Sequence, residues 1–519
     1  MRYFNTSGPC NRIKHYMIEP STRIKGVEQL IDMEQYFVIH AARQSGKTTY
    51  LQDLTDRINA GGQYYALYCS LENMQSITDP VKGIPEIVVK IKNTLEELDI
   101  PRATEFAANP NFANFTDVLN RELKRFCKIL DKPLVILFDE ADCLSDDTLI
   151  SFLRQLRDGY NNRSRVPFVH SVALVGMRNI RDYKARIRPD SASLGSASPF
   201  NIVTETYTLK NFTKDEVRSL YHQHTDDTGQ QFDESAIDLV YEQTQGQPWL
   251  VNAIAREVIV KILESDYSKP VSKELVEEAI QTIILRRDTH IDSLLERLKE
   301  ERVRKVIEPM ITGSDELPDK FSDDYQYTLD LGLIRRENYT TVPANPIYAE
   351  VIARTLSANC QDDIASKKPD FEIPRYLKDG RIDMDFLMRD FQQFWRENSE
   401  IWEKRFDYVE AAPHLIMMAF LQRVINGGGQ IHRNMAARTG RLDLCLVYEN
   451  EKYPIELKIR YDTKTVEKGL LQTARYIESY GCRKGWLAVF DRRKTVKWND
   501  KLFMEDRIVD GTIVTVVGL

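Results

Sequence analysis

Residues 36–58 read YFVIHAARQSGKTTYLQDLTDRI, and this stretch decides the fold of the first half of the chain. The short apolar run Tyr36–His40 has the length and the residue types of a buried strand. The polar loop Ala41–Thr49 follows it, and a helical pattern begins after the loop. A strand, a tight loop and a helix in this order predict an open sheet flanked by helices.

The loop fits the pattern GxxxxGK[ST], except that Ala41 replaces the first glycine. In such a loop, inward-facing backbone N–H groups and the positive N-terminal end of the next helix cradle a polyphosphate. Gly46 permits close approach, Lys47 supplies a charge to the β- and γ-phosphates, and Thr48 offers a hydroxyl to Mg²⁺. The predicted nucleotide-binding residues of the loop are Ala41, Gln44, Ser45, Gly46, Lys47, Thr48 and Thr49.

A second stretch, Pro133–Asp142, reads PLVILFDEAD and predicts a buried strand that ends in two adjacent carboxylates. Asp139 can hold Mg²⁺ directly or through water, and Glu140 is placed to polarise an attacking water. The alternative is a strand end with two solvated acids. The phosphate loop upstream favours the first interpretation, in which ATP and Mg²⁺ bind here.

Runs of strand length also occur at Tyr64–Cys69, Leu134–Phe138 and Ser171–Val175. Apolar strands that alternate with helical stretches predict a parallel sheet covered on both faces. Arg178 follows the last of these runs, where it would read the γ-phosphate; the alternative is a surface arginine.

From residue 213 to about residue 295 the pattern is wholly helical and predicts a lid. Gly246-Gln247-Pro248 separates two of the lid helices, where it would bend the backbone over the adenine; the alternative is an ordinary loop turn. Residues 300–358 follow with helices and a predicted β-wing at Leu333–Val342, which is the profile of a small winged-helix domain.

Together these motifs resemble the archaeal-type ATPases, a branch of the STAND class of AAA-like P-loop NTPases. The resemblance covers roughly residues 30–358 and implies an ATP-driven conformational switch that uses Mg²⁺ and assembles as a homo-oligomer. The sequence departs from the pattern at Ala41, and no arginine finger is identified. A winged helix can bind DNA, but the resemblance favours a regulatory packing element.

The C-terminal region carries another constellation. Residues 440–444 read GRLDL, and Tyr453–Ile459 reads YPIELKI. Glu456 and Lys458 are two residues apart on one predicted strand, so they share a face. With Asp443 on the preceding strand, two carboxylates and a lysine would converge, and such a set can bind Mg²⁺ and cleave a phosphodiester.

This arrangement resembles the PD-(D/E)xK nuclease superfamily over about residues 400–500. The resemblance implies that Glu410, on a helix upstream, supplies a further acid to the metal; Glu403 and Asp407 are alternatives to it. Gln472 and Tyr476 lie downstream as QTARY and match the QxxxY of RecB-like nucleases. Mn²⁺ is an alternative metal, and the alternative function is a degenerate fold that binds without cutting.

Composition and charge limit the classes of protein to which this chain can belong. The 519 residues are 42% hydrophobic and 29% charged, as in globular proteins. The seven cysteines show no metal or disulfide pattern, the N-terminus has no secretory h-region, and no apolar run spans a bilayer. We therefore expect a cytoplasmic protein without a membrane partner.

The net charge of −7 divides into −11 for residues 1–395 and +4 for residues 396–519. The positive C-terminal part permits nucleic-acid binding, with DNA favoured over RNA. Basic residues near the predicted nuclease site would contact phosphates without reading sequence; they are Arg433, Arg438, Arg441, Arg460, Lys464, Arg492, Arg493 and Lys494.

The predicted fold class is a multidomain α/β protein. Its parts are a P-loop ATPase core with a parallel sheet (1–210), a helical lid (211–298), a winged helix (299–358), a linker (359–395) and a restriction-endonuclease-like α/β domain (396–519). The leading hypothesis is an ATP-regulated, metal-dependent nuclease, of a kind that resembles defence or mobile-element proteins. The competing hypothesis is a signalling or scaffold ATPase whose C-terminal domain binds without cleaving. A DNA-translocating motor is a third alternative, disfavoured by the lack of helicase motifs.

Overall fold

The computed structural model describes the chain apart from residues 76, 108–114, 145, 177–201, 287–288, 313–318, 338–339, 368–372, 404–411, 426–429, 438–439, 450, 461–463 and 494–495. The chain divides into two compact units. The first comprises Met1–Arg286 with Gln326–Ile334, and the second comprises Arg287–Tyr325 with Arg335–Leu519. Within the described residues, no helix is both long and apolar enough to cross a membrane.

The first unit contains a parallel sheet of five strands in the order β2-β3-β4-β1-β5. The strands are β1 (Tyr36–His40), β2 (Tyr65–Ser70), β3 (Leu134–Asp139), β4 (Ser171–Gly176) and β5 (Val203–Thr208). The first four confirm the strands predicted from the apolar runs. The sequence analysis missed β5, which pairs with β1 at the sheet edge and is largely exposed, so its polar sequence VTETYT gives no apolar signal.

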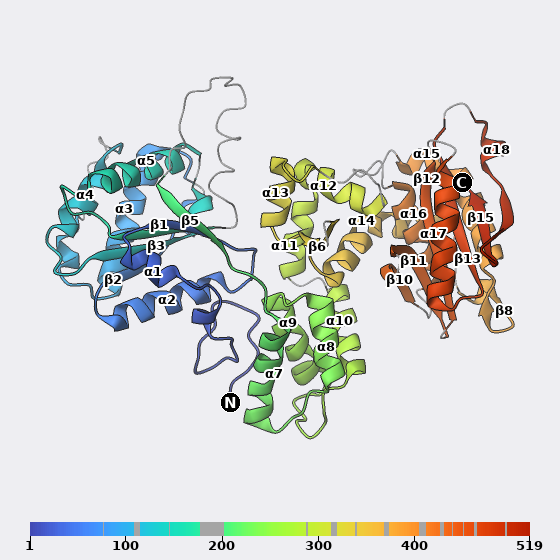
Figure 1. Cartoon of the computed structure of the whole chain (residues 1–519), viewed down its shortest axis with the longest axis horizontal. Helices are drawn as coiled ribbons and strands as arrows, with labels where there is room; N and C mark the ends of the chain where they lie inside the picture. Colours follow the sequence, from blue (N-terminus) through green and yellow to red (C-terminus); the bar gives the residue numbers. More distant parts are fainter. Residues whose placement is uncertain are drawn as a thin grey trace. The chain divides into compact units, whose positions relative to one another are not determined.

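Helices cover both faces of this sheet, as predicted (Figure 1). On one face, α1 (Val27–Asp32) and α2 (Lys47–Gly61) share a core with strand residues such as Phe37 and Leu137. On the other face the core includes the alternate strand residues, such as Val38 and Ile136, and side chains of three helices. These helices are α3 (Pro80–Glu97), α4 (Val118–Cys127) and α5 (Asp146–Asn162). Alternate strand residues therefore point into two separate cores, which is why the central strands β1, β3 and β4 are almost wholly apolar.

The lid is helical, as predicted. It contains α7 (Lys214–Thr228), α8 (Glu234–Thr244), α9 (Pro248–Arg256), a π-helical turn (Glu257–Ile262) and α10 (Lys273–Arg286). The first of these helices begins with a capping box in which Thr213 and Glu216 satisfy each other's backbone N–H groups. Short 3₁₀ turns occur at Pro20–Thr22, Glu72–Met74, Ala103–Glu105 and Ala141–Cys143.

The segment predicted as a winged helix contains α11 (Thr289–Leu298), α12 (Glu301–Thr312), α13 (Asp323–Asp330), β6 (Ile334–Glu337), β7 (Thr340–Pro343) and α14 (Pro346–Lys367). The hairpin of β6 and β7 lies where the β-wing was predicted. Much of the segment predicted as a linker has regular structure. It holds the end of α14, a 3₁₀ turn (Ile373–Tyr376), β8 (Leu377–Lys378), β9 (Arg381–Ile382) and the start of α15 (Met384–Glu403).

The second unit contains a six-stranded sheet in the order β10-β11-β12-β13-β15-β14. Its elements are α16 (Ala412–Ile425), β10 (Gln430–Ala437), β11 (Gly440–Tyr448), β12 (Glu451–Arg460), α17 (Lys464–Tyr480), β13 (Lys484–Asp491), α18 (Trp498–Lys501), β14 (Met504–Val509) and β15 (Thr512–Gly518). β10, β11 and β12 are antiparallel neighbours, whereas β12, β13 and β15 run parallel.

Helices lie on both faces of the second sheet. Side chains of α17, among them Leu470 and Ile477, share a core with Leu487 and Val489 of β13. On the opposite face, Phe490 of β13 contacts aromatic rings of α15, with its centroid 4.9 Å from that of Trp395. β12 is therefore a central strand, covered on one face by α17.

Candidate functional site

The phosphate loop connects β1 to α2 in the predicted manner. Gly46 caps α2 in the left-handed conformation, with φ +88°, and Gln44 also has a positive φ of 58°. Ala41 is buried and donates its N–H to the carbonyl of Gly176 at 3.2 Å. It is not among the described residues with positive φ, so an alanine fits where the pattern has glycine. Ser45 is buried and its hydroxyl donates to the carbonyl of Ala42, which tightens the loop.

Lys47 lies between the two carboxylates at the end of β3. Its Nζ is 2.5 Å from Glu140 Oε1 and 3.1 Å from Asp139 Oδ1. Burial lowers the pKa of Lys47, but the charges of Asp139 and Glu140 outweigh burial and the net shift is upward. Burial also raises the pKa of Glu140, although Lys47 opposes that shift. The structure thus joins the two motifs that the sequence placed about 90 residues apart.

The geometry around Asp139 fits a magnesium ion. Thr48 donates its hydroxyl to Asp139 Oδ2 at 3.4 Å, and the N–H of Glu140 donates to Asp139 Oδ1 at 2.8 Å. A hydroxyl and a buried carboxylate at the end of a strand are the oxygen ligands that Mg²⁺ takes beside nucleotide phosphates. Glu140 has a left-handed backbone with φ 54°, which turns its side chain away from the strand and towards Lys47.

Two contacts in this site were missed by the sequence analysis, one by a residue it did not name and one by Gln247 of the Gly246-Gln247-Pro248 motif. Tyr68 on β2 donates its hydroxyl to Asp139 Oδ2 at 3.0 Å. The sequence could have indicated Tyr68, because it lies near the C-terminal end of a predicted strand. The C-terminal ends of parallel strands lie at the same edge of a sheet, where Asp139 was also expected. Gln247 is the second: its Nε2 donates to the carbonyl of Gln44 at 3.4 Å. No sequence rule would have singled out that contact.

The other predicted nucleotide residues are placed differently. Pro248 is the first residue of α9, and Gln247 caps that helix by accepting the N–H of Leu250. Among the described contacts it is therefore Gln247, and not Pro248, that reaches the phosphate loop. Thr49 accepts a hydrogen bond from the N–H of Cys10 at 2.9 Å, so it also anchors the N-terminal segment. Arg178 lies outside the described residues.

In the second unit, Glu456 and Lys458 lie on one face of β12, the face predicted from their spacing, and form an ion pair that was not predicted. Lys458 Nζ lies 2.8 Å from Glu456 Oε1, and the Glu456 side chain is only 2% exposed. The pair lies on the face covered by α17. A Cβ added to Gly469 of α17 would lie 3.2 Å from Lys458 Cγ and 2.7 Å from Leu487 Cδ1. The absence of a side chain at Gly469 therefore lets the helix pack closely over the lysine.

The strand register brings Asp443 to the same place. Leu444 of β11 pairs with Ile455 of β12 in antiparallel register, so the position of Asp443 is opposite that of Glu456. Residues opposite each other on antiparallel strands share a face of the sheet. The side chain of Asp443 and the whole of Glu410 lie outside the described residues.

α17 carries the other two predicted residues. Gln472 is one turn after Gly469, half-buried, and its Oε1 is buried without a hydrogen-bond partner among the described residues. Tyr476 is 3% exposed and packs against Cys445 of β11. Among the described residues, no group of three or more His, Cys, Asp or Glu side chains is gathered as a metal site.

Basic groups flank this strand. Arg460 follows Lys458 on the same face of β12, with Nη1 3.8 Å from Asp491. Arg493 binds the same carboxylate at 2.6 Å. Burial would raise the pKa of Asp491, but the hydrogen bonds from Arg493 lower it. Side chains of the predicted basic residues Arg433, Arg438, Arg441, Lys464 and Lys494 lie outside the described part.

One family model and several solved structures match part of the chain. The sequence model of a family described as an AAA-like domain matches residues 11–354. The Walker-type ATPase paby2304 of Pyrococcus abyssi is similar in structure, with 14% identity and a TM-score of 0.46 over 67% of this chain and 99% of that chain. The RuvB Holliday junction branch migration motor of Thermotoga maritima has 12% identity and a TM-score of 0.33 over 64% of this chain and 92% of its own. The ORC1 protein of Aeropyrum pernix, solved in complex with DNA, has 12% identity and a TM-score of 0.34 over 66% of this chain and 94% of its own. No curated protein matches the sequence.

Proposed function

Because the chain belongs to the AAA-like domain family, we propose that its first unit binds ATP at residues 41–49 and hydrolyses it. The observation that carries this proposal is the meeting of Lys47 with Asp139 and Glu140 at the end of the parallel sheet. In open α/β sheets, ligands bind at the carboxyl ends of the strands. Arg178 and Pro248 stay in the proposal as predicted contacts.

The residues have distinct roles in this reaction. The ammonium of Lys47 would bind the β- and γ-phosphates and so release Glu140 from their ion pair. Glu140 would then accept a proton from the attacking water, and burial, which raises its pKa, makes it a stronger base. Thr48 and Asp139 would hold Mg²⁺, which neutralises charge on the phosphates when it is bound.

For the second unit we propose metal-dependent cleavage of a nucleic-acid phosphodiester, with DNA favoured. The buried Glu456–Lys458 pair on β12 carries this proposal, because burying two charges is costly unless they serve a site. The position of Asp443 opposite Glu456 supports it. So does the order of elements, in which α16, three antiparallel strands, α17 and the parallel strand β13 follow one another.

Each predicted residue of the second unit has a role in the proposed cleavage that fits its chemistry. Asp443, Glu456 and Glu410 would hold the metal, Lys458 would neutralise the transition state, and Gln472 and Tyr476 would orient the others. The ATPase would control this site through its nucleotide state and through homo-oligomerisation. The test is cleavage of DNA by the full-length protein with Mg²⁺ or Mn²⁺, beside Lys458→Ala, which should hydrolyse ATP but not cut.

A binding module without turnover is the second candidate. It is favoured by the ion pair itself, because Lys458 neutralises the charge of Glu456 in the absence of a metal. The two candidates differ in one observable: a binding module would retain affinity for DNA in every metal and nucleotide condition, and would cut in none. Affinity with no cleavage would therefore select this alternative.

A further inference from the structure

The N-terminal segment places an arginine beside the phosphate loop. Arg23 follows a 3₁₀ turn, Pro20–Thr22, and precedes α1. A Cβ built on Gly46 would lie 3.7 Å from Arg23 Nη1, so the guanidinium is adjacent to the loop that would hold the phosphates. No sequence motif pointed to this residue.

The guanidinium also contacts the segment that connects the sheet to the lid. Its Nη2 donates to the carbonyl of Lys210, and its carbon lies 4.7 Å from the centroid of the Phe212 ring. These two residues lie between β5 and α7, where the chain leaves the sheet for the lid. Arg23 thus lies beside the phosphate loop and contacts the start of the lid.

The polar contacts of Arg23 are incomplete. A guanidinium has five N–H donors, and within the described part of the chain it makes no ion pair with a carboxylate. Glu216 acts on it only at longer range, and that side chain already caps the N-terminus of α7. Burial lowers the pKa of Arg23 to about 10, which reflects the cost of holding the charge there. An anionic ligand would supply the charged partner that the guanidinium lacks among the described residues.

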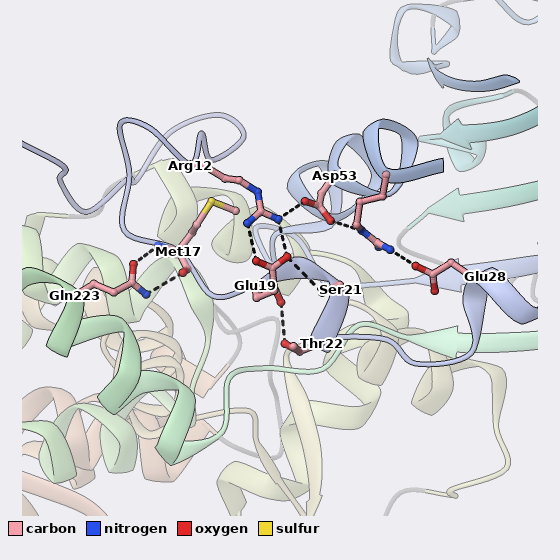
Figure 2. A network of polar contacts seen from close by, with 9 residues as sticks. Arg12, Met17, Glu19, Ser21, Thr22, Glu28, Asp53 and Gln223 are labelled. Carbon is pink, nitrogen blue, oxygen red and sulfur yellow. Dashed lines mark hydrogen bonds and ion pairs between the residues drawn. The ribbon is translucent and has the colours of Figure 1, made fainter. Parts of the chain in front are cut away.

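The chain that leads to Arg23, from Arg12 to Thr22, is held from two sides (Figure 2). Arg12 binds Glu19 through both of its terminal nitrogens at 2.6 Å, and also binds Asp53 of α2 at 2.5 Å. Met17 exchanges two backbone hydrogen bonds with the side chain of Gln223 on α7. The segment is therefore fixed to both the phosphate-loop helix and the lid before any ligand binds. Binding would then cost little conformational entropy in this segment.

We infer that Arg23 binds the polyphosphate of the nucleotide and thereby links the phosphate loop to the start of the lid. This inference rests on the proposed binding of ATP. The guanidinium would add charge-assisted hydrogen bonds to the phosphate oxygens while keeping its contacts with Lys210 and Phe212.

The test compares Arg23→Gln with wild type in nucleotide binding by the full-length protein, measured calorimetrically with adenosine, ADP, ATP and inorganic tripolyphosphate. One charge-assisted hydrogen bond contributes about 1.5–3 kcal/mol, so ATP and tripolyphosphate should bind about 10- to 100-fold more weakly. Adenosine should bind as before. Arg23→Lys keeps the charge and should recover much of the affinity. Arg102→Gln is the matched control, because Arg102 is an exposed arginine paired with Glu105 at 2.6 Å, outside the N-terminal segment, and should not alter binding.

The outcomes separate the two claims. If wild type binds none of the phosphate ligands, the proposed ATP site fails together with the inference. If wild type binds them and Arg23→Gln binds them equally well, the inference alone is overturned. If Arg23→Gln bound adenosine and ATP more weakly by the same factor, the inference would also be overturned, because Arg23 would then only support the shape of the site. Should Arg23→Gln fail to fold, Arg23→Met, which keeps an unbranched side chain without the charge, takes its place and is judged by the same outcomes.

Discussion

Lys47 Nζ lies 2.5 Å from Glu140 Oε1, so the cation of the phosphate loop and the carboxylate proposed as general base neutralise each other. In the proposed reaction, Lys47 binds the phosphates and Glu140 accepts a proton from water, so the two cannot stay paired. Phosphate binding would have to exchange this ion pair for a contact between Lys47 and the nucleotide, which ties the release of Glu140 to the arrival of ATP.

Replacing Glu140 by glutamine should separate binding from hydrolysis. The amide keeps the shape but cannot accept a proton, so the hydrolysis rate should fall by about 10²- to 10⁴-fold. The Kd for ATP should stay the same or fall, because Lys47 no longer has to leave this carboxylate. Calorimetric binding and phosphate release, measured on one preparation, check both parts. Unchanged hydrolysis would exclude Glu140 as the base.

Replacing Lys47 by alanine should remove most of the nucleotide affinity. The substitution deletes the charge and leaves Asp139 and Glu140 beside the phosphates, and repulsion adds to the lost contact. We expect a Kd for ATP at least about 100-fold higher, at the upper end of what one charged hydrogen bond contributes. Lys299→Ala, which removes an exposed lysine paired with Glu296, is the control and should bind ATP normally. Normal binding by Lys47→Ala would contradict the assigned site.

Gly246, in the turn before α9, should tolerate no side chain. It has φ +70°, and an added Cβ would lie 1.8 Å from the carbonyl oxygen of Phe212. Gly246→Ala should lower the free energy of unfolding by more than about 3 kcal/mol, from left-handed strain and overpacking together. Gly229→Ala is the matched control, because Gly229 has φ +80° with nothing within 4 Å of the added Cβ. It should cost only about 1 kcal/mol. Equal urea midpoints for the two variants would contradict the predicted contact.

His414 should make the second unit sensitive to acid. Burial lowers the pKa of His414 from 6.5 to about 3. The unfolded chain therefore binds a proton between these values and the folded unit does not, so stability is present above pH 6.5 and is lost as the pH falls. The loss should approach about 1.4 kcal/mol for each pH unit below 6.5.

Urea unfolding at pH 7 and pH 5.5 measures this loss. His414→Leu should lose less stability between the two pH values than wild type does, whatever its absolute stability. His222→Leu, at an exposed position on α7, should leave the pH dependence of wild type unchanged. The same pH dependence in His414→Leu and wild type would show that another group is responsible.

The sequence predicted those parts of the fold in which burial alone determines the residue types. β3 and β4 are buried along their whole length and β1 is buried up to His40, so their apolar runs were easily identified. β2 is only partly buried, and its run of large apolar residues was still sufficient to identify it. The spacing of Glu456 and Lys458 fixed their shared face, and the structure pairs them at 2.8 Å. β5 was missed because an exposed edge strand needs no apolar residues.

Contacts between distant segments were beyond the sequence. The approach of Arg23 to Gly46, and that of Gln247 to Gln44, depend on how the N-terminal segment and the lid pack on the sheet. No local pattern encodes these contacts, because an arginine or a glutamine in a loop is compatible with many partners. Likewise, Lys47 and Glu140 were each identified from their motifs, but their ion pair required the geometry of the sheet edge.

The most direct test of an ATP-regulated nuclease is metal-dependent cleavage by the purified full-length protein. Circular and linear DNA, single-stranded DNA and RNA would be incubated with Mg²⁺ or Mn²⁺, with and without ATP, beside two variants. Lys458→Ala removes the proposed active-site lysine, and Lys452→Ala removes an exposed lysine from the same strand. We predict cutting by wild type and Lys452→Ala that responds to ATP, and none by Lys458→Ala, with ATP hydrolysis equal in all three. Cleavage by Lys458→Ala at the wild-type rate, or none by wild type in any condition, would contradict the account.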